Sequence, residues 1–404
     1  MSITVSQRIN SCLVTGDPVV KVLDFGQHPY ADSFIAQDQL HLSEPVFPLE
    51  VNLSPEVGML QLGYISNASE RYNLYSYSYT SSNSQTAKNH WDSYAKWVKD
   101  RYRTDGLVVE IGSNDGYLIG QFSTGVGVDS SAEMSSIARQ QGIKTINSLY
   151  DLSVARQLKQ EHGPAQVVMA NNVFNHANDP VRFASSVSEV LDTTGVFIFE
   201  VPYWLVMVQS GRFTDMVYHE HPLYFTVKGA WNLLKKAGLT IVDFDIVNYH
   251  GGSLRVVAQR DHGQPMPNKV QMAIDQETQA GLFTEIFYQQ LQDKFKRDRT
   301  VWLKNFYQLL EQDPPAVIIG VGAAAKANTW LRWHGLDAGT INYVTDSSPH
   351  KQGKYTPLTR IPIAGDEIFA QFTNPYALVL SWNINEDLKK AILNINPQTR
   401  FISQ

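Results

Sequence analysis

A short apolar run that carries an acid and opens into a glycine loop constrains this chain more than any other stretch. Residues 107–119 read Leu-Val-Val-Glu-Ile-Gly-Ser-Asn-Asp-Gly-Tyr-Leu-Ile, so that Glu110 precedes Gly112 and Gly116. The run predicts a buried strand, and the loop after it leads into helical spacing. Because a carboxylate repels phosphate, this loop suits a cationic or hydroxylated ligand.

A second acid follows at the end of the next apolar run. Asp129 closes the run 126–128, where a carboxylate can accept hydrogen bonds from a ribose diol. The two acids with glycines between them fit S-adenosylmethionine better than a nicotinamide cofactor, and another Rossmann-like use is the alternative. The predicted cofactor-binding residues are Glu110, Gly112, Asn114, Gly116, Asp129 and Asn171.

Composition indicates a globular chain with more than one domain. Its 404 residues exceed one ordinary core, and 43% hydrophobic against 18% charged residues excludes a disordered chain. A net charge of -6 gives no long-range attraction for nucleic acid or an anionic membrane. The single cysteine, Cys12, forms no intrachain disulfide, and no apolar stretch reaches the ~20 residues that span a bilayer. We therefore expect a cytoplasmic protein with no nucleic-acid, membrane or obligate protein partner.

Strand, loop and helix signals alternate through the middle of the chain. The apolar runs lie at 107–111, 126–128, 166–170 and 195–201. Such alternation predicts a parallel sheet with helices on both faces and ligands at the carboxyl ends of its strands. The expected fold class is α/β, with a small β-rich domain at 1–80, a central Rossmann-like domain at 81–264 and a second Rossmann-like domain at 265–404.

Polar residues gather after two of the predicted strands. Asn172 and His176 follow the third strand, and they would share one face if a helix begins there. His250 and Ser253 flank paired glycines that allow close backbone approach, so both could line the same cleft. The alternatives are a structural histidine at position 176 and a plain turn into an edge strand at 250–253.

The richest polar run is Tyr-His-Glu-His at 218–221, which is expensive to bury without a purpose. Carbon-carbon bond formation needs a base near neutral pKa and donors that stabilise an enolate. His221 or His219 and Tyr218 can supply these roles, with Glu220 to orient the imidazole. The alternatives are that this run forms part of a metal site or that it is a solvated surface turn.

Two further stretches carry candidate substrate contacts. Tyr77 and Tyr79 belong to a run of alternating tyrosines, which either pack their rings on the next domain or form a lid over a polar substrate. A second strand and glycine loop at 316–329 lacks an acid at the place of Glu110. Lys326 and the loop amides, with Lys351 nearby in sequence, could therefore meet a phosphate. The alternatives are a nicotinamide site with Asp346 on a ribose, or an empty structural copy.

Six phrases of the chain together resemble the sugar C-methyltransferase family. They lie at 109–118, 172–176, 218–221, 250–253, 320–328 and 351–355. The first alone is common to many methyltransferases, whereas the combination is specific and covers essentially the whole chain. The resemblance implies a three-domain enzyme that uses S-adenosylmethionine to add a branch methyl at C3 of a nucleotide-linked 4-keto-deoxysugar.

The resemblance also implies roles for individual residues. His221 would remove the C3 proton, and Tyr218 would hydrogen-bond the developing enolate. Glu220 would position His221 or contact a sugar hydroxyl. Asn172 and His176 would lie beside the transferred methyl. The nucleotide-sugar would lie between the central methyltransferase domain and the C-terminal domain. The expected substrate-binding residues are Tyr77, Tyr79, His250, Ser253, Lys326, Asn328 and Lys351.

One departure from the family concerns zinc. The family's N-terminal domain usually holds a zinc ion with two Cys-x-x-Cys pairs, and the matching places here are residues 12–16 and 54–58. Only Cys12 is present, and one thiolate cannot hold tetrahedral zinc. We therefore expect no zinc and no other metal.

Two other functions fit parts of the sequence. An O- or N-methyltransferase acting on another small acceptor would need a base but no enolate stabiliser. A non-catalytic protein that binds sugar nucleotides would keep the fold without turning over the methyl donor.

Overall fold

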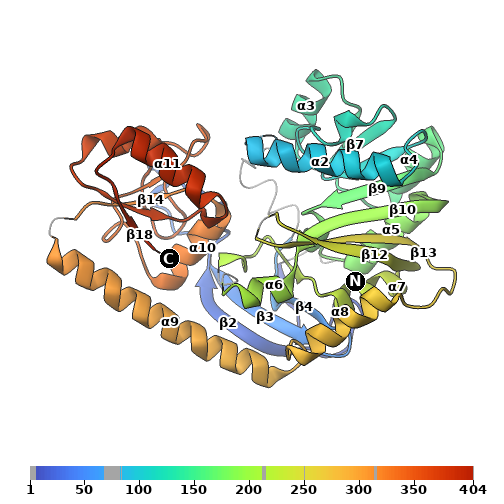
Figure 1. The fold of residues 1–404 in the computed structure, drawn as a ribbon, viewed down its shortest axis with the longest axis horizontal. Helices are drawn as coiled ribbons and strands as arrows, with labels where there is room; N and C mark the ends of the chain where they lie inside the picture. Colours follow the sequence, from blue (N-terminus) through green and yellow to red (C-terminus); the bar gives the residue numbers. More distant parts are fainter. Residues whose placement is uncertain are drawn as a thin grey trace.

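The computed structural model describes residues 6–67, 82, 84–211, 215–249, 251–313 and 316–403. Tyr77, Tyr79 and His250 lie outside the described residues. Within the described ranges, no helix combines the length and apolar character needed to cross a bilayer. Figure 1 shows a central sheet flanked by helices, a second sheet beside it, and the N-terminal strands below the two.

Seven strands form the central sheet in the order β12-β13-β10-β9-β6-β7-β8. Their bounds are β6 (Val108–Ile111), β7 (Gly125–Asp129), β8 (Thr145–Asn147), β9 (Ala165–Asn171), β10 (Leu191–Pro202), β12 (Leu239–Val247) and β13 (Ser253–Arg260). The predicted strands are parallel, whereas β13 runs antiparallel to both β10 and β12. The carboxyl ends of β6, β7 and β9 therefore meet at one edge of the sheet.

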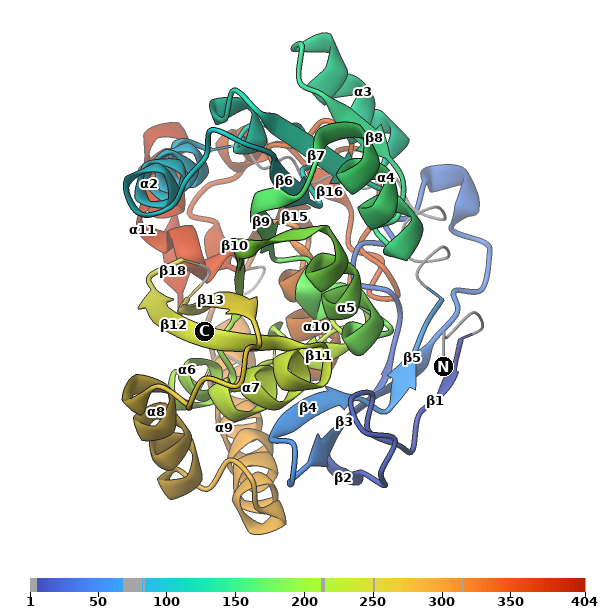
Figure 2. The ribbon, with the colours of Figure 1, turned by 90° about the vertical axis from the view of Figure 1, so that its right-hand side faces the viewer.

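Helices cover both faces of this sheet because side chains alternate along each strand. Val108 packs with α2 (Gln85–Arg101), whereas Val109 faces the larger core. Figure 2 shows α2 on one side of the strands and α5 on the other. The remaining helices of this part are α3 (Ala132–Gln140), α4 (Leu152–His162), α5 (Pro180–Val190), α6 (Trp204–Gln209) and α7 (Val227–Lys236).

The N-terminal part is β-rich, as predicted, but its main sheet includes a strand from much later in the chain. The order is β11-β4-β3-β2, and β1 pairs with β5 separately. The bounds are β1 (Gln7–Arg8), β2 (Val20–His28), β3 (Phe47–Ser54), β4 (Met59–Leu62), β5 (Tyr64–Ile65) and β11 (Leu223–Tyr224). Because β11 pairs with β4, the polar run 218–221 lies beside the N-terminal sheet. The boundary at residue 80 stays a prediction.

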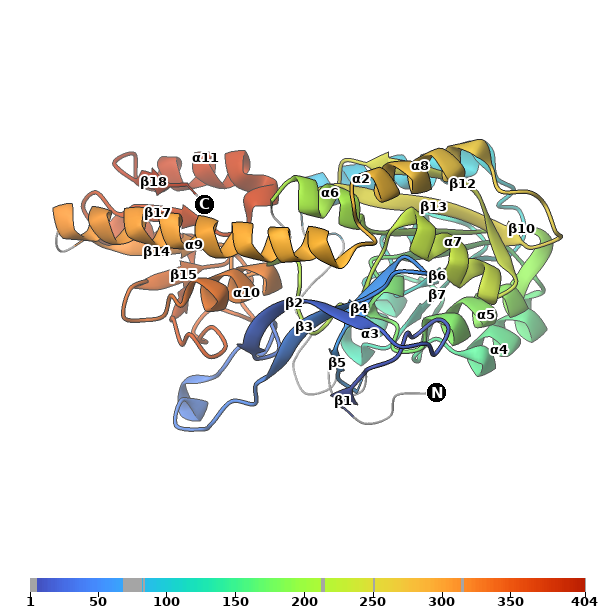
Figure 3. The ribbon, with the colours of Figure 1, turned by 90° about the horizontal axis from the view of Figure 1, so that it is seen from below.

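The C-terminal part is a second, fully parallel α/β unit. Its sheet has the order β16-β15-β14-β17-β18. The bounds are α8 (Asn268–Gln279), α9 (Glu285–Gln312), β14 (Ile318–Val321), α10 (Ala325–His334), β15 (Tyr343–Thr345), β16 (Ile363–Ala364), β17 (Tyr376–Val379), α11 (Asn385–Ile395) and β18 (Arg400–Ile402). Figure 3 shows the long helix α9 running from the C-terminal sheet toward β2. This helix therefore connects the C-terminal part with the N-terminal sheet.

Candidate active site

The loop after β6 needs glycine at two positions. Gly112 has φ +69°, and a Cβ there would lie 2.2 Å from Cγ2 of Val173. Gly116 has φ +81°, and its Cβ would lie 2.6 Å from Cδ1 of Ile143. Both backbone conformations disfavour other residues. The glycines therefore let the loop pass close to the ends of the neighbouring elements.

Asp129 is held in one orientation at the end of β7. Its Oδ2 accepts a hydrogen bond from the backbone amide of Asn114 at 2.8 Å, and its Oδ1 accepts one from the amide of Ser131 at 2.8 Å. Burial raises the pKa of this carboxyl, and the two amide bonds oppose that rise. A carboxylate has about four acceptor sites, so further hydroxyl donors can bind.

Glu110 is the strongest sign of a ligand at this edge. Its side chain is buried, and its Oε2 makes no hydrogen bond with any residue that the structure describes. Burial raises the pKa of Glu110 well above its usual value, and the charges of Asp115 and Asp129 add to the rise. Because buried polar groups are normally paired, a cationic or hydroxylated ligand would satisfy this oxygen. The chain's own residues therefore fit S-adenosylmethionine, with Asn171 on the adjacent strand end.

The catalytic candidates meet on the neighbouring loops. The hydroxyl of Tyr218 lies 2.9 Å from Nε2 of His221, and their ring centroids are 4.1 Å apart. The ring of His176 packs edge-on against that of His221 at 4.7 Å. His221 is 7% exposed, which leaves it shielded but reachable. The structure thus brings His221, Tyr218 and His176 together.

Asn172 and His176 would share a face only if a helix began at Asn172, and no helix begins there. Asn172 has φ +53°, and the short 3₁₀ helix that follows begins only at Phe174. The amide of Asn172 instead donates to the carbonyl of Glu200 at 2.7 Å. A left-handed residue cannot start a right-handed helix, so the condition for a shared face is not met.

Glu220 reaches into the N-terminal part. Its Oε1 accepts from the amide of Ala31 at 2.9 Å, and the amide of Asp32 lies 3.4 Å away. Burial, reinforced by the charge of Asp32, raises the pKa of Glu220 to about 7. In the structure Tyr218, rather than Glu220, bonds the ring nitrogen of His221.

His219 is buried in an aromatic cluster, which argues against the metal alternative. Its ring packs edge-on against Tyr30, Phe47 and Tyr64 at centroid distances of 6.2, 5.7 and 6.3 Å. The side chains of residues 219, 220 and 221 thus enter three different surroundings. No group of three potential ligands among the described residues is placed to hold a metal.

The described substrate candidates are engaged in contacts of their own. Nδ2 of Asn328 donates to the carbonyl of Ala31 at 2.6 Å, and the hydroxyl of Ser253 donates to the carbonyl of Tyr249 at 2.9 Å. Nζ of Lys351 donates to the carbonyl of Ala323 at 2.8 Å and lies 3.3 Å from Asp346.

Lys326 lies over the ring of Trp382 at 4.7 Å. The roles predicted for these residues at the substrate stay predictions.

Sequence reasoning missed a buried charge network beside this edge. Glu200 is fully buried on β10, and its Oε2 lies 2.8 Å from Nε2 of His90 on α2. Nε of Arg255 on β13 donates to the other oxygen at 2.6 Å. The only signal was an acid inside the apolar run 195–201. A buried acid in such a run needs partners.

The comparisons with known proteins decide the family. A C-methyltransferase from Streptomyces niveus, NovU, is 30% identical over 385 residues, which covers 93% of this chain and 90% of that protein. The chain belongs to the S-adenosylmethionine-dependent C-methyltransferase family. Family models described as a methyltransferase domain and a C-methyltransferase C-terminal domain match residues 92–243 and 248–403. The chain is therefore an enzyme, and its expected fold class is confirmed.

Two solved methyltransferase-like structures each overlap less than half of this C-methyltransferase. The PH0226 protein from Pyrococcus horikoshii OT3 is 18% identical, with a TM-score of 0.37 over 46% of this chain and 95% of that one. A magnesium protoporphyrin IX methyltransferase from Synechocystis PCC 6803 is 18% identical, with a TM-score of 0.34 over 43% and 83%. Likenesses this low carry no argument about substrate.

The prediction that this C-methyltransferase binds no zinc is contradicted. Residues 12–72 match a family model described as a putative zinc binding domain. The donors of this module do not fit a tetrahedral zinc, because Cys12 is the single cysteine of the chain and no three potential ligands among the described residues are grouped to hold a metal. The family match and the described donors therefore disagree at this module.

Proposed function

We propose that this enzyme adds a methyl group to C3 of a nucleotide-linked 4-keto-deoxysugar through an enolate. The pairing of Tyr218 with His221 at 2.9 Å supports the proposal most directly. An acceptor carbon next to a carbonyl needs one group to remove a proton and another to stabilise the oxygen that becomes negative. This pair supplies both within one contact.

The tautomer of His221 assigns the two roles. With the ring proton on Nε2, this nitrogen donates to the oxygen of Tyr218, and the hydroxyl of Tyr218 is directed at the sugar carbonyl. Nδ1 of His221 would then take the C3 proton, while the electrons of the broken C–H bond move onto the carbonyl oxygen. S-adenosylmethionine, held by the loop after β6, would supply the methyl group. As the enolate returns those electrons to C3 and the new C–C bond forms, the bond between sulfur and methyl would break, and its electron pair would stay on the sulfur of the departing S-adenosylhomocysteine.

Burial and orientation of the pair favour this chemistry. A shielded hydrogen bond to a developing oxyanion is stronger than one in water, because the effective dielectric constant is lower. The loop after β6 would hold the methyl donor against the same sheet edge, so that acceptor and donor react as an oriented pair, which can contribute roughly 7 to 11 kcal/mol. Lys326, Asn328 and Lys351 would face the nucleotide.

Proton exchange at C3 tests the base independently of methyl transfer. In D₂O with a 4-keto-deoxysugar nucleotide and S-adenosylhomocysteine, the wild-type enzyme should exchange C3–H for deuterium, as seen by NMR. His221→Ala should slow both exchange and methylation by roughly 10² to 10⁴-fold. Tyr218→Phe should slow both as well, because the enolate loses its donor.

Two outcomes would overturn the proposal. Normal exchange in His221→Ala with both ligands bound would exclude His221 as the base. A product whose new methyl group is attached to oxygen or nitrogen, as identified by its NMR shift, would show that the enzyme does not methylate carbon in this sugar. Titration calorimetry with a panel of nucleoside diphosphates would then identify the nucleotide.

A further inference from the structure

A pocket that contains two arginines lies away from the active site, where β2 packs against α9 and α10 (Figure 1). It encloses about 240 Å³, and its lining residues are Phe25, Gly26, Gln27, His28, Arg299, Arg332, Trp333 and Gly335. The pocket therefore joins the N-terminal sheet to the C-terminal part. Its two positively charged side chains come from different helices, Arg299 from α9 and Arg332 from α10.

Neither arginine of this pocket forms an ion pair with a carboxylate among the described residues. Arg332 donates from Nε to the carbonyl of Gln27 at 3.2 Å, which leaves its two terminal nitrogens for other partners. Nε of Arg299 is buried and has no hydrogen-bond partner in the part of the chain that the structure describes. Asp24 directly precedes Phe25 of the pocket lining, but its carboxylate already accepts hydrogen bonds from Lys21 and from the amide of Gly26.

Aromatic walls fix the guanidinium of Arg299 in place. It lies over the ring of Trp333 at 5.2 Å, and the ring of Phe25 meets Trp333 edge-on at 5.4 Å. A Cβ built on Gly335 would stand 3.7 Å from Nη2 of Arg299, so the absence of a side chain there keeps this end of the guanidinium accessible. Preorganised guanidinium groups lose less freedom on binding an anion.

Two buried histidines respond to the uncompensated charge. The pKa of His28 is lowered to about 4, first by burial and then by the charge of Arg332. The pKa of His334 is lowered to about 4, first by burial and then by the charge of Arg299. Both rings are therefore neutral near pH 7, and neither adds charge to the pocket.

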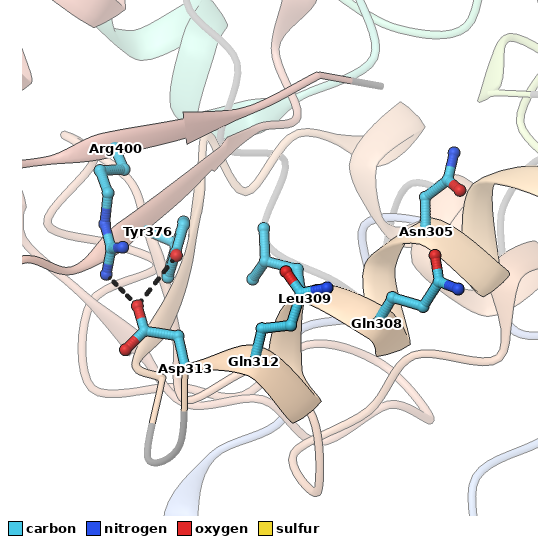
Figure 4. Close-up of a pocket in the computed structure, with 7 residues that line it drawn as sticks. All are labelled: Asn305, Gln308, Leu309, Gln312, Asp313, Tyr376 and Arg400. Atoms are coloured by element: carbon cyan, nitrogen blue, oxygen red, sulfur yellow. Dashed lines mark hydrogen bonds and ion pairs between the residues drawn. The ribbon is translucent and has the colours of Figure 1, made fainter.

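A larger pocket in the described part of the chain shows the opposite arrangement. It encloses about 510 Å³ beside the end of α9, and Arg400 there is paired with Asp313, which also accepts from Tyr376 at 3.0 Å (Figure 4). Its cation is neutralised within the pocket. An anion would have to compete with Asp313, so this pocket does not favour anion binding.

We propose that the pocket between Arg299 and Arg332 binds a phosphate group, as inorganic phosphate or at the end of a small phosphate ester. Guanidinium groups match phosphate oxygens with paired N–H donors, and two of them on separate helices can hold one dianion. A bound phosphate would connect α9 with α10 beside β2. It would therefore stabilise the joint between the N-terminal and C-terminal parts, because it binds only the folded chain.

The test compares sodium phosphate with sodium chloride at equal ionic strength on the full-length protein. Phosphate should raise the melting temperature by a few degrees more than chloride does. In selectively ¹³C-histidine-labelled protein it should also shift the ring signals of His28 and His334, because a phosphate bound by Arg332 and Arg299 changes the electric field at the two rings that these charges act on. Titration with glycerol phosphate distinguishes an ester from the free ion.

Matched variants locate the effect. Arg299→Gln and Arg332→Gln should each reduce the phosphate response at least several-fold, whereas Arg400→Gln, in the neutralised pocket, should keep it. His221→Ala should keep it too, so failure here is separate from failure of the proposed catalysis. The proposal is overturned if phosphate leaves the signals of both histidines unmoved. An equal gain in melting temperature in a variant that carries both Arg299→Gln and Arg332→Gln would also overturn it, because phosphate stabilises many proteins by exclusion from their surfaces.

Discussion

In the loop after β6, the proposed site of the methyl donor, Gly112 tolerates substitution least, because its backbone is left-handed and its neighbour is close. We expect Gly112→Ala to destabilise the fold by roughly 1 to 3 kcal/mol for backbone strain and to weaken S-adenosylmethionine binding, because its Cβ would meet Cγ2 of Val173 at 2.2 Å. Gly142→Ala is the matched control, since Gly142 has φ +79° and nothing within 4 Å of its Cβ. Urea unfolding and titration calorimetry measure both effects.

The contact with Val173 separates the two causes. Val173→Ala in the Gly112→Ala background removes Cγ2 and should recover part of the lost binding, while the cost of the positive φ stays. Equal losses in Gly112→Ala and Gly142→Ala would show that the contact does not matter.

Local chemistry was predictable from the sequence, whereas distant partners were not. Glu110 and Asp129 could be placed at adjacent strand ends, because an apolar run followed by an acid and a glycine is a local pattern. Glu220 could not be placed correctly. Its partner Ala31 lies 189 residues away, and no local pattern reports such a contact.

Helix α2 is held on the central sheet by the charges beneath it. His90 on α2 bonds Glu200 on β10, and Arg255 on β13 bonds the same carboxylate while its guanidinium lies 4.5 Å over the ring of Tyr94. A buried carboxylate that loses its partner is left with an unpaired charge. This network therefore fixes α2 beside the proposed donor site.

Arg255→Gln should lower the free energy of unfolding by about 3 to 5 kcal/mol, because Glu200 is fully buried. The double variant Glu200→Gln, Arg255→Gln should recover much of that loss, since no charge stays unpaired. Lys96→Gln on the same helix breaks the exposed pair with Asp100 and should change stability by less than about 0.5 kcal/mol. Urea unfolding of the four proteins tests the network, and a double variant no better than Arg255→Gln would contradict it.

The periodicity of the hydrophobic residues predicted which segments are strands, but it did not predict which strands pair or in which register. The runs at 107–111 and 166–170 predicted β6 and β9 because each is apolar and bounded by turn residues. Strand β11 escaped prediction, since Leu223–Tyr224 is too short for any periodicity and exists only through its pairing with β4. The antiparallel placement of β13 is likewise set by its neighbours.

At the scale of the whole molecule, a loop of the N-terminal part is bound by both the central part and the C-terminal part. Ala31 donates its amide to Glu220 of the central part, and its carbonyl accepts from Asn328 of the C-terminal part. Four residues on, Ile35 forms a β-bridge with Tyr355. Because Glu220 lies one residue from His221, the N-terminal loop fixes the backbone beside the proposed base. Domain arrangement and active-site geometry are thus linked through one carboxyl group.

The proton on Glu220 should therefore control how firmly the parts are joined. Burial raises its pKa to about 7 from the usual 4.5, so between these values the folded chain holds a proton that the unfolded chain has lost. Stability from this group is complete below pH ~4.5 and falls as pH rises toward 7, by at most about 1.4 kcal/mol per pH unit. Glu220→Gln, which cannot ionise, should lack this slope.

Other groups change stability in the opposite direction, so the prediction concerns the difference between two proteins. His28 and His334 have lowered pKa values, so their contribution to the free energy of unfolding rises with pH between about 4 and 6.5. Subtracting the urea-unfolding free energy of Glu220→Gln from that of the wild type at each pH removes their contribution. The difference should fall from pH 4.5 to 7 and level off above. A flat difference for Glu220→Gln would contradict the prediction, because the proton on Glu220 would then have no effect on stability.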